Sequence, residues 1–244
     1  MEKGKGLAIA RGIVLAAAVF AVAMLIASGP GTRSDAWSWK VGLLLFIFAG
    51  WIGIVAAIAS AVLVAASMVP RWRRQPWMPV VSLCLALVAV APPLIFRAHA
   101  KQVPPIHDVT TDSEDPPQFV ALHAEREKSP NGFAYGGAQV AAQQHAAYPD
   151  IKPLEVSTPP REELQHAIDA ARAMGWEVVA SDAQSGRIEA TARTRWFGFS
   201  DDIVVRIRPQ GTGSRVDVRS ASRVGRSDVG ANAARVREYL GRLA

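Results

Sequence analysis

Three long apolar stretches fill most of the first 97 residues, and they constrain the fold of this 244-residue chain more than any other feature. They run from Leu7 to Ser28, from Val41 to Val69 and from Trp77 to Phe96. A helix needs about 20 apolar residues to cross the hydrocarbon layer of a bilayer. The sequence therefore predicts three transmembrane helices. Pro92 and Pro93 are expected to stop or kink the third one.

Lysine and arginine are distributed unevenly around these stretches. Six precede or open the first stretch or lie between the second and third, namely Lys3, Lys5, Arg11, Arg71, Arg73 and Arg74. Four lie on the other side, namely Arg33, Lys40, Arg97 and Lys101. Cytoplasmic loops carry the excess of positive charge. The distribution predicts a bacterial inner-membrane protein with a cytoplasmic N-terminus and a periplasmic C-terminal domain.

The first stretch also has the features of a cleaved signal peptide, with a short basic start, an apolar run and "AVAMLIASG". Cleavage would not change the topology, because the other two spans still return the chain to the outside. The second and third spans have few polar side chains, and these are typical of helix packing rather than of a transport pathway. They are Ser60, Ser67, Ser82 and Cys84.

The composition changes after residue 97, where charge and proline rise. We divide the chain into a transmembrane region (1–98), an extended Pro/Gly-rich segment (99–158) and a soluble domain (159–244). The net charge of +6 belongs to basic membrane loops and an arginine-rich domain, so we expect no nucleic acid partner. Cys84 is the only cysteine, which excludes a disulfide within one chain.

The soluble domain has alternating helix and strand patterns. "PREELQHAIDAARAM" is typical of a helix with Leu164, Ile168, Ala171 and Met174 on its inner face, ended by Gly175. "WEVVASD", "GRIEATART", "SDDIVVRIRP" and "SRVDVRSAS" predict strands, the last two by their period of two. A closing helix would bury Ala233, Val236, Leu240 and Leu243. This order predicts an α+β domain with an antiparallel sheet of about four strands and helices on one face.

The other face of that sheet is expected to be exposed and charged. It would carry Arg187, Glu189, Arg206, Arg208, Arg215, Asp217 and Arg219. The segment "IHDVTTDSED", residues 106–115, is acidic and would lie against this basic face. It also offers five side chains of metal-ligand type, but their spacing matches no ligand pattern, and we expect neither a metal nor a cofactor.

"RWFGFSDDIVVRIRP" and "VDVRSASRVGRSDVGANAARVREYL" together resemble the core of the domain-of-unknown-function family DUF1499. "IHDVTTDSEDPPQF" and "AAYPDIKPL" are similar to the preceding segment of its membrane-anchored bacterial members. The resemblance covers roughly residues 104 to 241. Shorter soluble members have a cysteine in that preceding segment, which this chain lacks. The resemblance implies a domain and a membrane-anchored arrangement, and it implies no activity.

Residues 153–244 contain 14 arginines and no lysine. Three interpretations remain open: a face that binds anions through guanidinium groups, a composition typical of GC-rich genomes, and internal pairing with the domain's own carboxylates. The candidate contact residues for an anion or a partner are Arg206, Arg208, Arg215, Arg219, Arg223 and Arg226. The candidate partners are the bilayer itself, anionic lipid, an envelope polymer or an acidic protein.

Three carboxylates form an alternative site, Asp201, Asp202 and Asp228. Asp201 and Asp202 open a strand and would point to opposite faces, so they are not expected to act as a pair. Ser227 or Asp228 is expected to cap the last helix. The sequence therefore favours a non-enzymatic binding module of the cell envelope. The alternative is a metal- or carboxylate-dependent envelope hydrolase, and no catalytic residue can be named.

Overall fold

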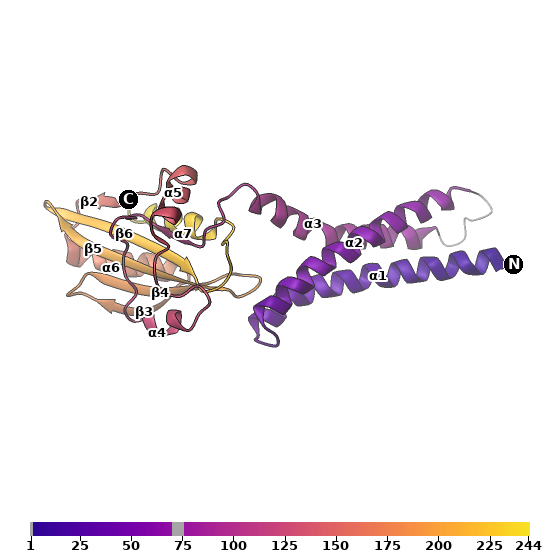
Figure 1. Cartoon of the computed structure of the whole chain (residues 1–244), viewed down its shortest axis with the longest axis horizontal. Helices are drawn as coiled ribbons and strands as arrows, with labels where there is room; N and C mark the ends of the chain where they lie inside the picture. Colours follow the sequence, from indigo (N-terminus) through magenta and orange to yellow (C-terminus); the bar gives the residue numbers. More distant parts are fainter. Residues whose placement is uncertain (1, 70–75) are drawn as a thin grey trace. The chain divides into compact units, whose positions relative to one another are not determined.

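The computed structural model describes residues 2–69 and 76–244 (Figure 1). The chain divides into two compact units. The first comprises Met1–Ala98 together with Arg195–Gly198, and the second comprises His99–Thr194 and Phe199–Ala244. The three arginines placed between the second and third apolar stretches, Arg71, Arg73 and Arg74, lie outside the described residues.

Three long helices begin the chain: α1 (Glu2–Arg33), α2 (Trp39–Ser67) and α3 (Trp77–Ala100). Each is long and apolar enough to cross a membrane, which confirms the prediction of three such helices. Pro92 and Pro93 do not stop α3, which continues to Ala100.

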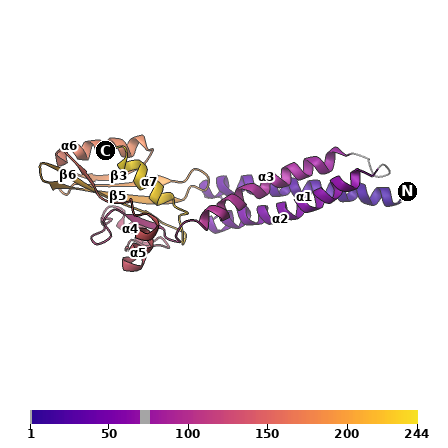
Figure 2. The same ribbon diagram turned by 90° about the horizontal axis from the view of Figure 1, so that it is seen from above.

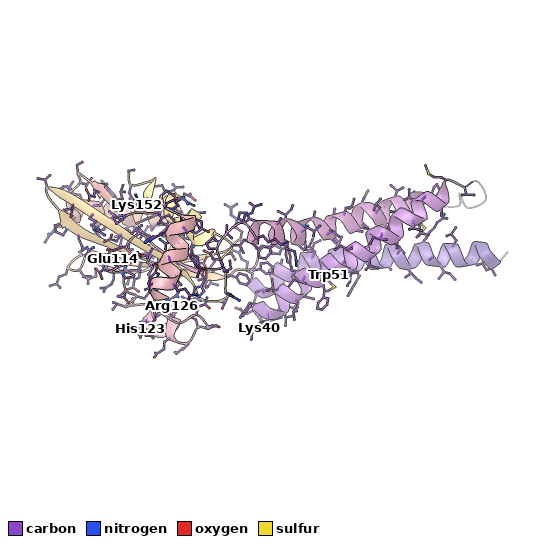
Figure 3. The ribbon with its side chains drawn as sticks, turned by 45° about the horizontal axis from the view of Figure 1, so that its top comes forward. Lys40, Trp51, Glu114, His123, Arg126 and Lys152 are labelled. Carbon is purple, nitrogen blue, oxygen red and sulfur yellow. The ribbon has the colours of Figure 1, made fainter. Side chains whose placement is uncertain are left out.

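Small residues on α2 allow the other helices to approach closely. A Cβ added at Gly53 would lie 2.8 Å from a methyl group of Val90 and 3.1 Å from the carbonyl oxygen of Ala86. Trp51, in contrast, is 60% exposed on α2 (Figure 3). Small inner residues and large outer ones are the pattern expected of helices packed in lipid. Arg11 is buried among these helices and donates a hydrogen bond to Ser67 Oγ at 2.8 Å.

The second unit contains one antiparallel sheet of six strands, not about four. These are β1 (Asp108–Thr110), β2 (Leu154–Val156), β3 (Glu177–Asp182), β4 (Arg187–Arg193), β5 (Ser200–Gln210) and β6 (Gly213–Ser222). The order is β1-β6-β5-β4-β3, and β2 also pairs with β6. The two additional strands have only three residues each, too few for a period of two to be detected in the sequence.

Four helices accompany the sheet: α4 (His123–Glu127), α5 (Gly137–Ala147), α6 (Pro160–Ala173) and α7 (Ala231–Leu240). Figure 2 shows α6 and α7 on one face of the sheet and α4 on the other. The α6–α7 face holds the main core, in which Leu164, Ile168, Val236 and Tyr239 pack on apolar side chains of the strands. Gly175, with φ of +74°, follows the end of α6 as expected.

Most of the second face of the sheet is covered, contrary to the expectation from the sequence. Glu189, Asp217 and Arg219 each have 0% relative exposure. Residues 111–135, which we call the covering segment, lie over this face, and Phe119 and Leu122 pack against Val204 and Ala221. The charges predicted that the acidic residues 106–115 lie on this face, but not that Phe119 and Leu122 cover it as well, because no local pattern connects these residues to the strands.

Candidate functional site

The covered face of the sheet brings together most of the charged residues singled out in the sequence. Side chains of alternate residues on a strand point to the same face. Nine side chains of the three central strands therefore lie on the covered face. They are Glu189 and Thr191 of β4, Asp202, Val204, Arg206 and Arg208 of β5, and Arg215, Asp217 and Arg219 of β6.

Glu189 attaches the covering segment to this face. Its Oε1 accepts hydrogen bonds from the backbone N–H groups of Val120 and Ala121, and its Oε2 accepts one from Leu122, each at 2.9 Å. Arg187 Nε lies 3.1 Å from the same carboxylate. A buried carboxylate is stabilised only when its oxygens have such partners. Glu189 is therefore a structural residue, which fixes the turn that leads into α4.

Arg219 is fully buried on the covered face. Its Nε and Nη2 donate to the two oxygens of Asp108 at 3.0 and 2.7 Å. Its remaining donors reach the carbonyl oxygens of Pro117 and Phe133 at 3.3 and 3.0 Å. The rings of Phe119 and of Tyr135 lie 5.0 and 5.5 Å from its guanidinium carbon. No part of this guanidinium is accessible to a ligand.

Asp202 is the centre of a second buried group. It accepts hydrogen bonds from Arg126 at 3.0 Å and from Thr191 at 2.8 Å. Arg223 donates to both oxygens of Asp202, each at 2.9 Å. Arg126, at the position marked in Figure 3, also donates to the carbonyl oxygen of Ala221 and lies 4.5 Å from the ring of Phe119. Arg223 has a further contact with Glu125 at 2.8 Å.

Three arginines form a more accessible group, which we call the arginine cluster: Arg206, Arg208 and Arg215. All three reach one oxygen of Asp112, at 3.2, 3.5 and 2.8 Å respectively. All three also contact the buried carboxylate of Asp217, at 2.9 to 3.0 Å.

Asp115 completes the arginine cluster at its rim. Its Oδ2 lies 2.9 Å from Arg206 and 3.2 Å from Arg208, while its side chain is 66% exposed. The side chains of Arg206, Arg208 and Arg215 are 18%, 40% and 30% exposed. Part of the cluster is therefore open to solvent, unlike Arg219. Arg226 is exposed on the loop after β6.

The carboxylates of the alternative site do not converge. Asp201 points to the α7 side and accepts a hydrogen bond from Arg235 at 2.6 Å, whereas Asp202 lies on the covered face. Asp228 accepts hydrogen bonds from the backbone N–H groups of Gly230 and Asn232 at 2.8 and 2.7 Å. The N-cap residue of α7 is Gly230, and Asp228, two residues before it, satisfies an N–H group of the first turn, which agrees with the expected capping role.

Two groups near the start of α7 have shifted pKa values. Burial raises the pKa of the Asp228 carboxyl, against the effect of the hydrogen bonds from Asn232 and Gly230. Burial lowers the pKa of the His107 imidazole, against the effect of the negative charges of Asp108 and Asp228. A neighbouring polar network joins Ser220, Ser222, Asn232 and Arg235 by side-chain hydrogen bonds.

Within residues 2–69 and 76–244, no three His, Cys, Asp or Glu side chains lie close enough together to hold a metal ion. Three of the four acidic side chains of residues 108–115 lie against the basic face, as the sequence suggested, whereas Glu114 is exposed. Asp108 binds Arg219, and Asp112 and Asp115 bind the arginine cluster. Arg126 and Arg235 were missed, because nothing in their local sequence indicates which strand they reach.

Long apolar helices followed by an antiparallel sheet with helices define a membrane-associated α+β protein. Residues 108–243 match the family model described as a protein of unknown function (DUF1499), so the chain belongs to this family and the resemblance seen in the sequence is confirmed. A search of the curated proteins found no match.

Proposed function

We propose that this chain is a bacterial inner-membrane protein whose periplasmic domain is a non-enzymatic binding module for ligands that carry carboxylates, such as an acidic segment of an envelope protein. The uneven distribution of lysine and arginine around the apolar stretches supports a cytoplasmic N-terminus. Three spans then leave the domain on the periplasmic side.

The observation that carries this proposal is the convergence of Arg206, Arg208 and Arg215 on carboxylates of the chain's own acidic segment. The planar guanidinium group suits carboxylates, which it can bind through two parallel hydrogen bonds. A cluster that already holds one acidic segment has the chemistry to hold another.

Replacement of an internal carboxylate by that of a ligand costs the least free energy at the rim of the cluster. Asp115 is 66% exposed, and exposed ion pairs contribute only about 0–1 kcal/mol. A carboxylate of a ligand can take the place of Asp115 on Arg206 and Arg208 without uncovering the sheet. Of the six arginines expected from the sequence, these two with Arg215 and the exposed Arg226 fit the role better than the buried Arg219 and the paired Arg223.

The competing class, an envelope hydrolase that uses Asp201, Asp202 or Asp228, has less support. The first two lie on opposite faces and are held by arginines, and the third caps a helix. A raised carboxyl pKa, as at Asp228, suits general acid chemistry. However, both oxygens of Asp228 are used by backbone N–H groups.

Binding of a fluorescent peptide with the sequence TTDSEDPP to the full chain in nanodiscs tests the proposal. Fluorescence anisotropy across a salt series should show saturable, salt-sensitive binding. The variant Asp115→Asn should bind the peptide more tightly, because it weakens the internal competitor. The variant Arg208→Gln should bind it more weakly.

Arg172→Gln is the matched control, since Arg172 is 65% exposed on α6, away from the arginine cluster. This change should leave binding unaltered. Equal affinities for Arg208→Gln and Arg172→Gln, or no gain from Asp115→Asn, would refute the arginine cluster as a binding surface.

A further inference from the structure

A second feature, independent of the arginine cluster, concerns the loop that joins β4 to β5. Residues Arg195–Gly198 of this loop form part of the first unit, with the three long helices. The indole N–H of Trp196 donates to Ser28 Oγ at 3.3 Å, and Arg33 donates to the carbonyl oxygen of Arg195 at 2.7 Å. These contacts attach the loop to the last turns of α1.

Gly29 makes room for the Trp196 ring. A Cβ added at Gly29 would lie 2.5 Å from two atoms of the indole, closer than side chains approach. Phe197 adds a second contact, because its ring and that of Phe46 form a T-shaped pair with centroids 5.7 Å apart, and Phe46 forms a similar pair with Phe96 at 5.8 Å. Gly29 of α1 and Phe46 of α2 therefore form a complementary packing site for the two aromatic side chains of the loop.

This packing site lies where the apolar run of α1 ends. Ser28 is the last residue of that run, and the polar sequence Gly-Pro-Gly-Thr-Arg follows it. Tryptophan is enriched at this depth in membrane proteins, because its ring is apolar and its N–H is polar. Trp196 is 45% exposed although one side of it rests on Gly29. Arg195 directly precedes Trp196 and Arg193 lies three residues before it, and both arginines are exposed.

We propose that the segment RTRWFGF, residues 193–199, is an interfacial membrane anchor. The exposed part of the Trp196 ring lies in the headgroup layer of the outer face of the bilayer, and Arg193 and Arg195 contact lipid phosphates. Arginine binds phosphate oxygens through its planar fork, and basic residues close to a membrane surface are attracted by anionic headgroups. The anchor also requires that α1 is retained, because cleavage at AVAMLIASG, residues 21–29, would remove Ser28 and Gly29.

A single-cysteine series in the full chain, reconstituted in liposomes, tests the anchor. Cys84 is replaced by serine, and an environment-sensitive fluorophore is attached at Trp196→Cys or at Val179→Cys. Val179 is the matched control, since it is an equally exposed apolar residue, 45%, but lies on the edge strand β3. Quenching is measured with aqueous iodide and with a phosphatidylcholine that carries a spin label near its headgroup.

The label at residue 196 should be quenched by the spin-labelled lipid and only weakly by iodide, with the reverse at residue 179. Equal iodide quenching at both positions would overturn the anchor. Protection of the label at 196 from both quenchers would also overturn it, since the loop would then be covered by protein.

The native tryptophan provides a second measurement. The spin-labelled lipid should quench a smaller part of the total tryptophan emission in Trp196→Phe than in the unchanged protein. In Trp176→Phe the emission quenched by this lipid should stay the same, because Trp176 is buried against Tyr239. Raising the share of phosphatidylglycerol should increase lipid quenching at 196, and Arg193→Gln with Arg195→Gln should remove that increase. An intact mass that lacks residues 1–29 would contradict the proposal.

Discussion

The two faces of the sheet are both covered, but by different kinds of layer. Along β5, Ile203, Val205 and Ile207 point into an apolar core beneath α6 and α7. Asp202 and Arg206 point the other way, into ion pairs with residues from α4 and the acidic segment. One strand therefore contributes to two buried layers. Charged residues at alternate positions of a strand do not by themselves indicate a face exposed to solvent.

The two layers differ in how they respond to a missing group. Removal of a methylene from an apolar core loses contacts in proportion to its size. Removal of one partner from a buried ion pair leaves the other charge without compensation, in surroundings that solvate it poorly. The charged layer should therefore be the more sensitive of the two to single substitutions, although it contributes less net stability as an intact layer.

Arg219→Leu should have the largest effect, because it leaves the Asp108 carboxylate buried and unpaired. We expect a loss of about 3–5 kcal/mol in the free energy of unfolding. Urea unfolding of the full chain in detergent, followed by near-UV circular dichroism, measures it. The double variant Arg219→Leu with Asp108→Leu should recover most of the loss. A loss below about 1 kcal/mol, as for an exposed pair, would show that water reaches this site.

Ile203→Val should have an intermediate effect on the apolar face. The change removes one buried methylene, which is worth about 0.5–1.5 kcal/mol in a well-packed core. The same unfolding experiment measures it, with Val179→Ala as a control at an exposed position, where changes stay within about 0.5 kcal/mol. A loss equal to that of Arg219→Leu would remove the difference between the two layers.

Arg208→Gln should have the smallest effect on stability. Arg208 is 40% exposed, and its contact with Asp115 is open to solvent. We expect a loss of less than about 1 kcal/mol, and a smaller one at high salt. Urea unfolding of the variant and of the unchanged chain at low and at high ionic strength measures the loss under each condition. A loss that does not change with salt would place Arg208 in the buried layer and would weaken the arginine cluster as a binding surface.

Part of this architecture could be predicted from the sequence because the signals are local. Hydrophobic length predicts α1 to α3, and the period of two predicts β5 and β6. Asp228 as a cap follows from its position before a helix. The strands β1 and β2 could not be predicted, since three residues carry no period. The opposite charges of residues 106–115 and of the sheet face predicted that the two lie together, but not that Asp108 is the residue that pairs with Arg219. Arg126 as a partner of Asp202 could not be predicted, because the two residues lie 76 positions apart in the chain.

The sequence alone determined that three apolar helices precede an antiparallel α+β domain, because hydrophobic length and periodicity are properties of consecutive residues. Only the tertiary structure decided which arginines remain exposed to solvent. Exposure depends on how distant parts of the chain cover the sheet and pair with its charges. Arg215 and Arg219 occupy equivalent places in the pattern of β6, yet one is 30% exposed and the other is enclosed. The difference arises where Pro117, Phe119 and Phe133 of the covering segment close over Arg219.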